Sequence, residues 1–264
     1  MNVVVLHRQS SIPDNSAEKF QMSVFQMGFR LIPLKLMRKV LVQLIGEKLD
    51  IEDLKTGLLS SVWTIAFEKE GYYLSSKILD GLFNNREIVL KACEFIDIMN
   101  GAANILYSNH KNVEVGNLTI VGPNGSNHVL IAETGHFKLR SRVREHLSVK
   151  NNDTSQPIIE TWLNKSNVNS NVKDALHFFS EVTWWNLYKI YEIINEDIGG
   201  QRRLYKLIDK DQIKLFTQAA QSRELLGDNA RHASKKYAPP KVKLTLEQAC
   251  HIIVVLFKKW VDSK

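Results

Sequence analysis

The sequence lacks most of the features that indicate a cellular compartment or a type of reaction. Its two cysteines, Cys93 and Cys250, lie far apart and not at metal-ligand spacing, which argues against a disulfide framework or a cysteine-based zinc site. No stretch reaches the roughly 18 uncharged apolar residues that a membrane-spanning helix needs. The short apolar run at residues 3–6 is not followed by a signal-peptide cleavage site. We therefore expect a cytoplasmic protein that does not associate with membranes.

Several catalytic motifs are also missing. The sequence contains no GxxxxGK[ST], GxGxxG, HExxH or GxSxG pattern, which makes nucleotide hydrolysis, zinc proteolysis and esterase chemistry poor candidates. Asp209 and Asp211 flank Lys210 and could offer two carboxylates to a cation, but such a pair is more typical of the start of a helix. The sequence thus predicts neither a metal site nor a cofactor.

The pattern of hydrophobic residues predicts an α+β fold. We expect a mixed strand and helix unit over residues 1–150 and a basic helical bundle over residues 151–264, with the polar stretch 148–156 as the boundary. The predicted elements of the first unit are an extended segment over 61–79 with a turn at 68–71, a helix over 84–107 with a soft stop at Asn100-Gly101, and strands over 113–121 and 129–139 joined by an Asn-Gly turn. Helix and strand both remain open for residues 36–49.

The second unit shows helical periodicity almost throughout. The expected helices cover residues 157–163, 172–179, 184–198, 202–208, 212–225 and 246–260, with the polar stretch 164–171 as an interruption. Gly199-Gly200 ends the third of these helices. The last helix has the clearest start, because Thr245 is followed three residues later by Gln248, which is the spacing of a capping box.

The positive charge is concentrated near the end of the sequence. The chain carries a net charge of +7, while residues 202–264 hold 14 Lys+Arg and 6 Asp+Glu, a net of +8. The remainder therefore holds 35−14 = 21 basic and 28−6 = 22 acidic residues, a net of −1. Clustered positive charge favours RNA, DNA or an acidic protein as a partner, although it also serves solubility alone. The candidate nucleic-acid-binding residues are Lys138, Arg140, Arg142, Arg144, Arg202, Arg203, Lys206, Lys235 and Lys236.

The segment 217–240 has the composition of a metal-free ribonuclease site. RNA cleavage needs a general base, a general acid and cations that stabilise the charged phosphorane. The candidate catalytic residues are His232, Arg231, Arg223 and Asn229. A structural interpretation is also open, in which Gly227, Asp228 and Asn229 form a turn, Arg231 pairs with Glu192 or Glu196, and His232 caps a helix.

A helical module with a paired arginine and histidine late in the chain resembles the HEPN superfamily of bacterial ribonuclease toxins and defence effectors. The resemblance implies metal-independent RNA cleavage, often by a dimer that joins two copies of the motif. The chain departs from the family spacing, because eight residues separate Arg223 from His232 while Arg231 and His232 are adjacent. The sequences WWNLYKIYEI, GDNARH, APP and LTLEQA in the last third of the chain also resemble the C-terminal part of uncharacterised bacterial proteins.

Aromatic residues accompany this basic region. Trp184, Trp185, Tyr188, Tyr191 and Tyr205 could stack on bases, but their helical spacing favours a place in the core. The leading hypothesis is a nucleic-acid-engaging protein, with ribonuclease activity as its sharper form. The alternative is a non-enzymatic subunit that binds nucleic acid or protein, and a small-ligand site between the two units is a third possibility.

Overall fold

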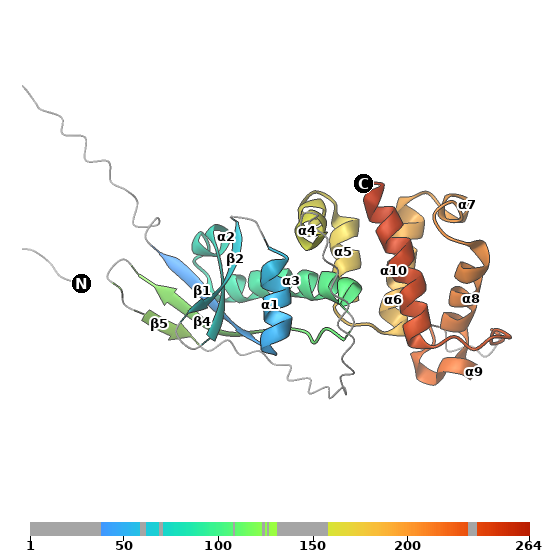
Figure 1. Cartoon of the computed structure of the whole chain (residues 1–264), viewed down its shortest axis with the longest axis horizontal. Coiled ribbons are helices and arrows are strands. Elements are labelled where there is room, and N and C mark those ends of the chain that lie inside the picture. Colours follow the sequence, from blue (N-terminus) through green and yellow to red (C-terminus); the bar gives the residue numbers. More distant parts are fainter. Residues whose placement is uncertain are drawn as a thin grey trace, which may run out of the picture. The chain divides into compact units, whose positions relative to one another are not determined.

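The computed structural model describes residues 38–58, 62–68, 71–107, 109–122, 125, 127–130, 158–231 and 237–264. Within them, five strands form one antiparallel sheet in the order β2-β3-β1-β4-β5 (Figure 1). The strands are β1 (Lys39–Ile45), β2 (Trp63–Glu68), β3 (Gly71–Ser76), β4 (Glu114–Val121) and β5 (Asn127–Leu130). Together with the helices below, this sheet confirms the predicted α+β class.

The sheet forms because alternate residues of its strands are apolar. In β1, Val40, Val42 and Leu44 are buried, and the residues between them are more exposed. This period of two places the apolar side chains on one face of the sheet. The segment 36–49, open between helix and strand from its sequence, contains β1 and the start of helix α1.

Both predicted hairpins are present. The extended segment 61–79 contains β2 and β3, which pair with each other, and β4 pairs with β5 across the predicted turn. The prediction is wrong for its last residues, because Lys77–Asp80 forms a short helix. Gly125 has a φ of 71° in that turn and donates a hydrogen bond of 3.0 Å to the carbonyl oxygen of Gly122. The left-handed backbone suits glycine, which has no Cβ to clash. Residues 131–157 lie outside the described residues, as does the predicted continuation of β5.

Three helices lie between the strands of the sheet in the sequence. They are α1 (Lys48–Thr56), α2 (Lys77–Asp80) and α3 (Asn85–Leu106). Asn84 caps α3, because its side chain accepts a hydrogen bond from the backbone nitrogen of Arg86. Phe95 of α3 stacks on Trp63 of β2 with 3.9 Å between the ring centroids, so the buried side of α3 and the apolar face of the sheet share one core.

The predicted stop of α3 at Asn100-Gly101 is wrong, because the helix continues to Leu106. Asn100 is buried and exchanges hydrogen bonds with the backbone of Val113, its Nδ2 donating at 2.8 Å and its Oδ1 accepting at 2.9 Å. Gly101 lies against a neighbouring helix, where a Cβ would come within 1.8 Å of the carbonyl oxygen of Leu176. The two residues that predicted a helix stop therefore serve to pack α3 against its neighbours.

The second half of the described chain is helical. Its elements are α4 (Ile158–Val168), α5 (Ser170–Phe179), α6 (Trp184–Asp197), α7 (Gln201–Leu204), α8 (Lys210–Gln221), α9 (Arg223–Leu226), the 3-10 turn Gly227–Asn229 and α10 (Leu246–Asp262). The predicted interruption over 164–171 shrinks to Asn169, whose side chain caps α5 by accepting from the backbone nitrogens of Asn171 and Val172. The capping box of Thr245 and Gln248 is present at the start of α10.

Asp197 connects three of these helices. Its carboxylate accepts hydrogen bonds of 2.8 Å from Asn171 of α5 and 2.8 Å from the indole nitrogen of Trp260 of α10, and it pairs with Lys264. The Phe257 ring contacts both Phe179 and Trp260, and all three side chains are fully buried. The polar ties and the aromatic packing together fix the positions of α5, α6 and α10.

Helix α3 contacts α4 and α5, so apolar packing continues from the sheet to the helical half (Figure 1). The side-chain amide of Asn104 also donates a hydrogen bond of 3.0 Å to the carbonyl oxygen of Phe179. The predicted division of the chain near residue 150 falls outside the described residues and stays a prediction. None of the helices in the described ranges combines the length and the apolar character needed to cross a membrane.

Candidate functional site

The structure describes only part of the predicted site. Arg223, Asn229 and Arg231 lie within the described residues, and so do the basic residues Arg202, Arg203 and Lys206. His232 and the basic residues Lys138, Arg140, Arg142, Arg144, Lys235 and Lys236 lie outside them. The structure therefore shows the surroundings of the two candidate arginines and of Arg202, Arg203 and Lys206. The predicted role of His232 stays a prediction.

Arg231 is held by contacts with three residues from earlier parts of the chain. Its backbone nitrogen donates to the carbonyl oxygen of Ala220 at 2.9 Å. Its guanidinium donates to Glu192 Oε1 at 2.6 Å and to the Tyr188 hydroxyl at 3.0 Å, and it lies over the Tyr188 ring at 4.3 Å from the centroid. The pairing with Glu192 that the sequence left open is thus present. Arg231 holds the segment after α9 against α6.

Arg223 and Asn229 belong to the turn between α8 and Arg231. Ser222 is buried and caps α9 by accepting from the backbone nitrogen of Leu225. Gly227 has a φ of 58°, a left-handed value that glycine adopts without strain. Arg223 Nη2 lies 3.5 Å from Asp228 Oδ1, and Asn229 is exposed. These contacts give the turn that the structural interpretation expected, with Asn229 available to solvent.

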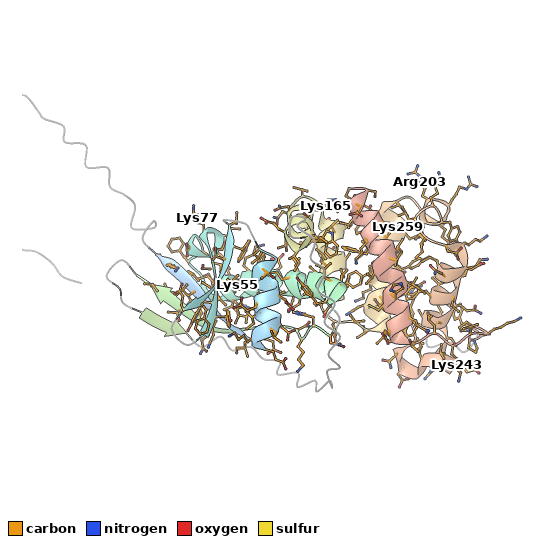
Figure 2. All side chains as sticks on the ribbon, viewed as in Figure 1. Lys55, Lys77, Lys165, Arg203, Lys243 and Lys259 are labelled. Carbon is orange, nitrogen blue, oxygen red and sulfur yellow. The ribbon has the colours of Figure 1, made fainter. Side chains whose placement is uncertain are left out.

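A compact basic surface lies on α7 and the turn that follows it. We call Arg202, Arg203 and Lys206 the α7 basic surface; all three side chains are exposed. The backbone nitrogen of Lys206 donates to the carbonyl oxygen of Arg203 at 3.0 Å, so the helical winding continues and residues three and four apart share one side. Arg203, labelled in Figure 2, donates a long hydrogen bond of 3.4 Å to the carbonyl oxygen of Ile198 at the end of α6. Three cations thus gather within one helical turn.

The acidic residues near this surface have other roles. Asp209 caps α8 by accepting from the backbone nitrogens of Asp211 and Gln212 at 2.8 Å and 3.1 Å. Asp211 lies 3.8 Å from Lys214 Nζ within the same helix. The two carboxylates therefore take the helix-start role that the sequence favoured. Among the described residues, the ion pairs include none of Arg202, Arg203 and Lys206.

Most of the aromatic cluster belongs to the core, as its helical spacing favoured. Trp184, Tyr188 and Tyr191 of α6 are buried and pack around Phe216. Trp185 differs, because 49% of it is exposed. Lys189 Nζ lies 5.9 Å from the Trp185 ring centroid and 4.6 Å from that of Phe178. An exposed aromatic ring beside a lysine is a combination that stacks on bases and contacts phosphates.

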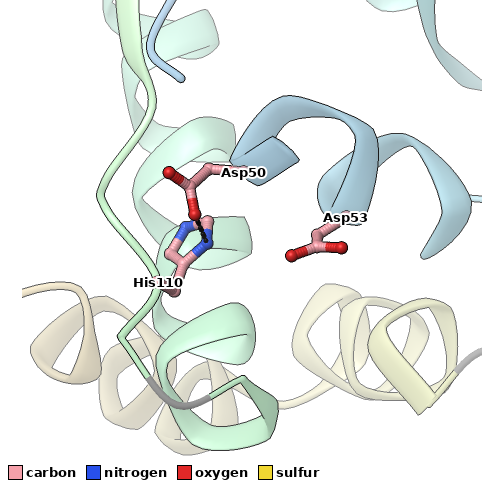
Figure 3. A group of neighbouring side chains, drawn as sticks. All are labelled: Asp50, Asp53 and His110. Carbon is pink, nitrogen blue, oxygen red and sulfur yellow. Dashed lines mark ion pairs between the residues drawn. The ribbon is translucent and has the colours of Figure 1, made fainter. Parts of the chain in front are cut away.

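Sequence reasoning missed a group of polar residues that fold together beside the sheet. Asp50 and Asp53 lie on α1, and His110 lies in the connection between α3 and β4; each offers a ligand atom, and these atoms lie within 4.8 Å of one another (Figure 3). The only sequence signal was the spacing of three between the aspartates, which places them on one side of a helix. His110 follows 57 residues later, and nothing local to it indicates this contact.

Comparisons of the chain with protein-family models, with curated proteins and with solved structures each found no match.

Proposed function

We propose that the protein binds nucleic acid through the α7 basic surface, with the exposed ring of Trp185 and its neighbour Lys189 as a second contact. The observation that carries the proposal is the gathering of Arg202, Arg203 and Lys206 within one helical turn, with the nearby carboxylates engaged elsewhere. Cations held close together attract a phosphate backbone and release its counterions. The proposal places this activity in the cytoplasm.

Binding is favoured over cleavage because of the state of Arg231. Its guanidinium already contacts Glu192 and Tyr188, and that neutralising ion pair reduces its attraction for phosphate. RNA cleavage through His232 and an arginine, which the HEPN-like resemblance implies, is the sharper form of the proposal. In the alternative form the protein is a binding subunit of a complex, and the GDNARH segment has a structural role.

The test is a titration of fluorescently labelled single-stranded RNA and duplex DNA, followed by anisotropy at several salt concentrations. The variant Arg202→Gln/Arg203→Gln/Lys206→Gln removes three charges from the α7 basic surface. We expect it to bind at least about tenfold more weakly, and the slope of log affinity against log salt for RNA to fall by about 2, at about 0.7 for each lost phosphate contact.

A matched control removes three charges elsewhere. Lys48→Gln/Lys77→Gln/Arg86→Gln changes three exposed residues of the sheet half and lowers the net charge equally. We expect it to bind nearly as well as the wild-type protein. Equal losses in the two variants would show that net charge alone drives the binding, and absence of binding by the wild-type protein would overturn the proposal.

An RNA-degradation assay on the wild-type protein and His232→Ala decides between the ribonuclease form and the binding-subunit form. RNA fragments formed without added metal, and lost in His232→Ala while affinity is retained, would establish the ribonuclease form. Binding without fragments would establish the binding-subunit form.

A further inference from the structure

The Asp50–Asp53–His110 group lies where α1 meets the connection between α3 and β4. The Asp50 and His110 side chains are both 0% exposed, and His110 Nδ1 lies 3.4 Å from Asp50 Oδ1 (dashed line in Figure 3). Asp53 lies one turn further along α1 and is half-buried. Two carboxylates and one imidazole thus lie together, and two of the three side chains are fully shielded from solvent.

The orientation of the His110 ring is fixed by its other nitrogen. Asn100 Oδ1 accepts from the backbone nitrogen of Val113 at 2.9 Å while Asn100 Nδ2 donates to the Val113 carbonyl oxygen at 2.8 Å, so the amide has one possible orientation. His110 Nε2 lies 3.2 Å from that same Asn100 Oδ1 and therefore donates to it. In the neutral ring, Nδ1 then carries its lone pair toward Asp50. Metal-binding histidines show this arrangement, with one nitrogen on the metal and the other donating to a carbonyl oxygen.

The spacing of the two atoms fits two ligands of one small cation. Bonds of about 2.1 Å from a central ion to nitrogen and oxygen, at the tetrahedral angle, place the ligand atoms about 3.4 Å apart. The measured separation of His110 Nδ1 and Asp50 Oδ1 is 3.4 Å. Asp53, a half-buried residue on the next turn of α1, offers a third ligand oxygen within 4.8 Å of the other two ligand atoms.

The charges near the group also favour a cation. Burying carboxylates is costly unless hydrogen bonds or positive charge compensate, and Asp50 Oδ1 accepts a hydrogen bond of 3.2 Å from the backbone nitrogen of Lys111. The neighbouring lysines are directed to other carboxylates, Lys111 to Glu47 and Lys55 to Glu52. A divalent ion would balance the charge of Asp50 and Asp53 with a neutral His110.

We propose that Asp50, Asp53 and His110 form a divalent-metal site, with Zn²⁺ as the preferred ion. One imidazole and two carboxylates suit a first-row divalent metal, and Zn²⁺ binds such sets more tightly than Mn²⁺ or Fe²⁺. The ion ties the two aspartates of α1 to the connection after α3, a pair of segments that the Lys111–Glu47 ion pair also joins. Three protein ligands leave a fourth position for water.

Isothermal titration of the chelator-treated full-length protein with Zn²⁺ tests the proposal. The wild-type protein should bind one ion at this site, and Zn²⁺ should raise its melting temperature because the ion binds the folded state. We expect His110→Ala and Asp53→Asn each to weaken binding at least about tenfold, by analogy with the loss that second-shell changes already cause. Asp53→Asn keeps the size of a half-buried side chain and reports on the site even where His110→Ala fails to fold.

The chain offers two matched controls. His177 Nδ1 lies 3.6 Å from Asp97 Oδ2 in a similar but exposed pair. Within the described ranges this pair belongs to no group of three possible ligands, so His177→Ala should bind Zn²⁺ as the wild-type protein does. Cys93→Ser/Cys250→Ser should also retain the site, which excludes adventitious binding by thiols. The proposal is overturned if the wild-type protein binds no ion, or if the His110 and Asp53 variants bind with wild-type affinity. In that event the pair of Asp50 with an imidazolium accounts for the buried contact.

Discussion

At the scale of single residues, Arg231 was predicted as a catalytic arginine and lies in a set of structural contacts. Its ion pair with Glu192 is partly exposed, which limits its contribution to about 0–1 kcal/mol. The contact with the Tyr188 ring adds about 0.5–1 kcal/mol. Together these contacts hold the turn after α9 against α6.

We expect Arg231→Ala to lower the free energy of unfolding by about 1–2 kcal/mol. Arg203→Ala is the matched control, because Arg203 is exposed and its guanidinium donates a long hydrogen bond of 3.4 Å to the Ile198 carbonyl oxygen. Urea unfolding of both variants checks the prediction. Unchanged stability of Arg231→Ala, together with weaker RNA binding, would assign Arg231 to the nucleic-acid interface instead.

Asp197 makes part of the stability depend on pH. Burial raises the pKa of its carboxyl, but hydrogen bonds from Lys264, Trp260 and Asn171 outweigh burial, so the pKa is lowered below its usual value. A carboxyl with a lowered pKa in the folded state contributes stability above its unfolded pKa and loses that contribution as pH falls through the folded pKa. The effect therefore belongs to the acidic range.

Asp197→Asn should lower the free energy of unfolding at pH 7 by about 1–3 kcal/mol, the usual loss for hydrogen bonds to a charged group. The difference from the wild-type protein should shrink as the pH falls through the lowered pKa of Asp197, because the wild-type carboxyl then becomes protonated. Denaturant unfolding at a series of pH values measures both quantities. A difference that stays constant with pH would contradict the assignment.

At the scale of elements, the contact between α3 and α5 depends on a missing side chain. A Cβ on Gly101 would come within 1.8 Å of the Leu176 carbonyl oxygen and 2.8 Å of its carbonyl carbon. These are backbone atoms of α5 and cannot rotate away. The helices must therefore separate to accept any larger residue.

We expect Gly101→Ala to destabilise the protein by about 3 kcal/mol or more, at the upper end of what overpacking costs. Gly81→Ala is the control, because its Cβ would meet the Ile78 carbonyl oxygen at 3.5 Å, an ordinary contact, and its φ of −80° suits alanine. Thermal unfolding followed by circular dichroism compares the two variants. Similar melting temperatures for both would contradict the close approach of α3 and α5.

Local signals in the sequence predicted the elements that depend on local interactions. The alternation in β1, the capping box of Thr245 and Gln248, and the Asn-Gly turn before β5 each act within a few residues. The helix stop at Asn100-Gly101 failed because its determinants are Val113 and Leu176, which are distant in sequence. Tertiary packing there overrides the local preference of asparagine and glycine.

The candidate site was predictable to a similar degree. Exposure of Arg202, Arg203 and Lys206 follows from their charge, and the burial of Trp184, Tyr188 and Tyr191 follows from their helical spacing. The approach of His110 to Asp50 depends on the course of the whole chain between α1 and β4. Sequence spacing carries no information about such a contact.

At the scale of the whole molecule, the sheet and the helices share packing through α3. We expect equilibrium unfolding in denaturant to show one transition, because α3 contributes side chains to the sheet core and contacts α5. Far-ultraviolet circular dichroism and hydrogen exchange of α10 amides should give the same midpoint. Two separate midpoints would support the predicted division near residue 150.

Strand β2 lies at the end of the sheet order, and among the described residues it pairs with β3 alone. Backbone groups along the outer side of such a strand can pair with a strand from another molecule. Phe67, 59% exposed, adds an apolar side chain to this edge, while Glu68 supplies a charge at its end. In concentrated solution, self-association should therefore begin along β2. The variant Phe67→Lys should aggregate more slowly during storage than the wild-type protein.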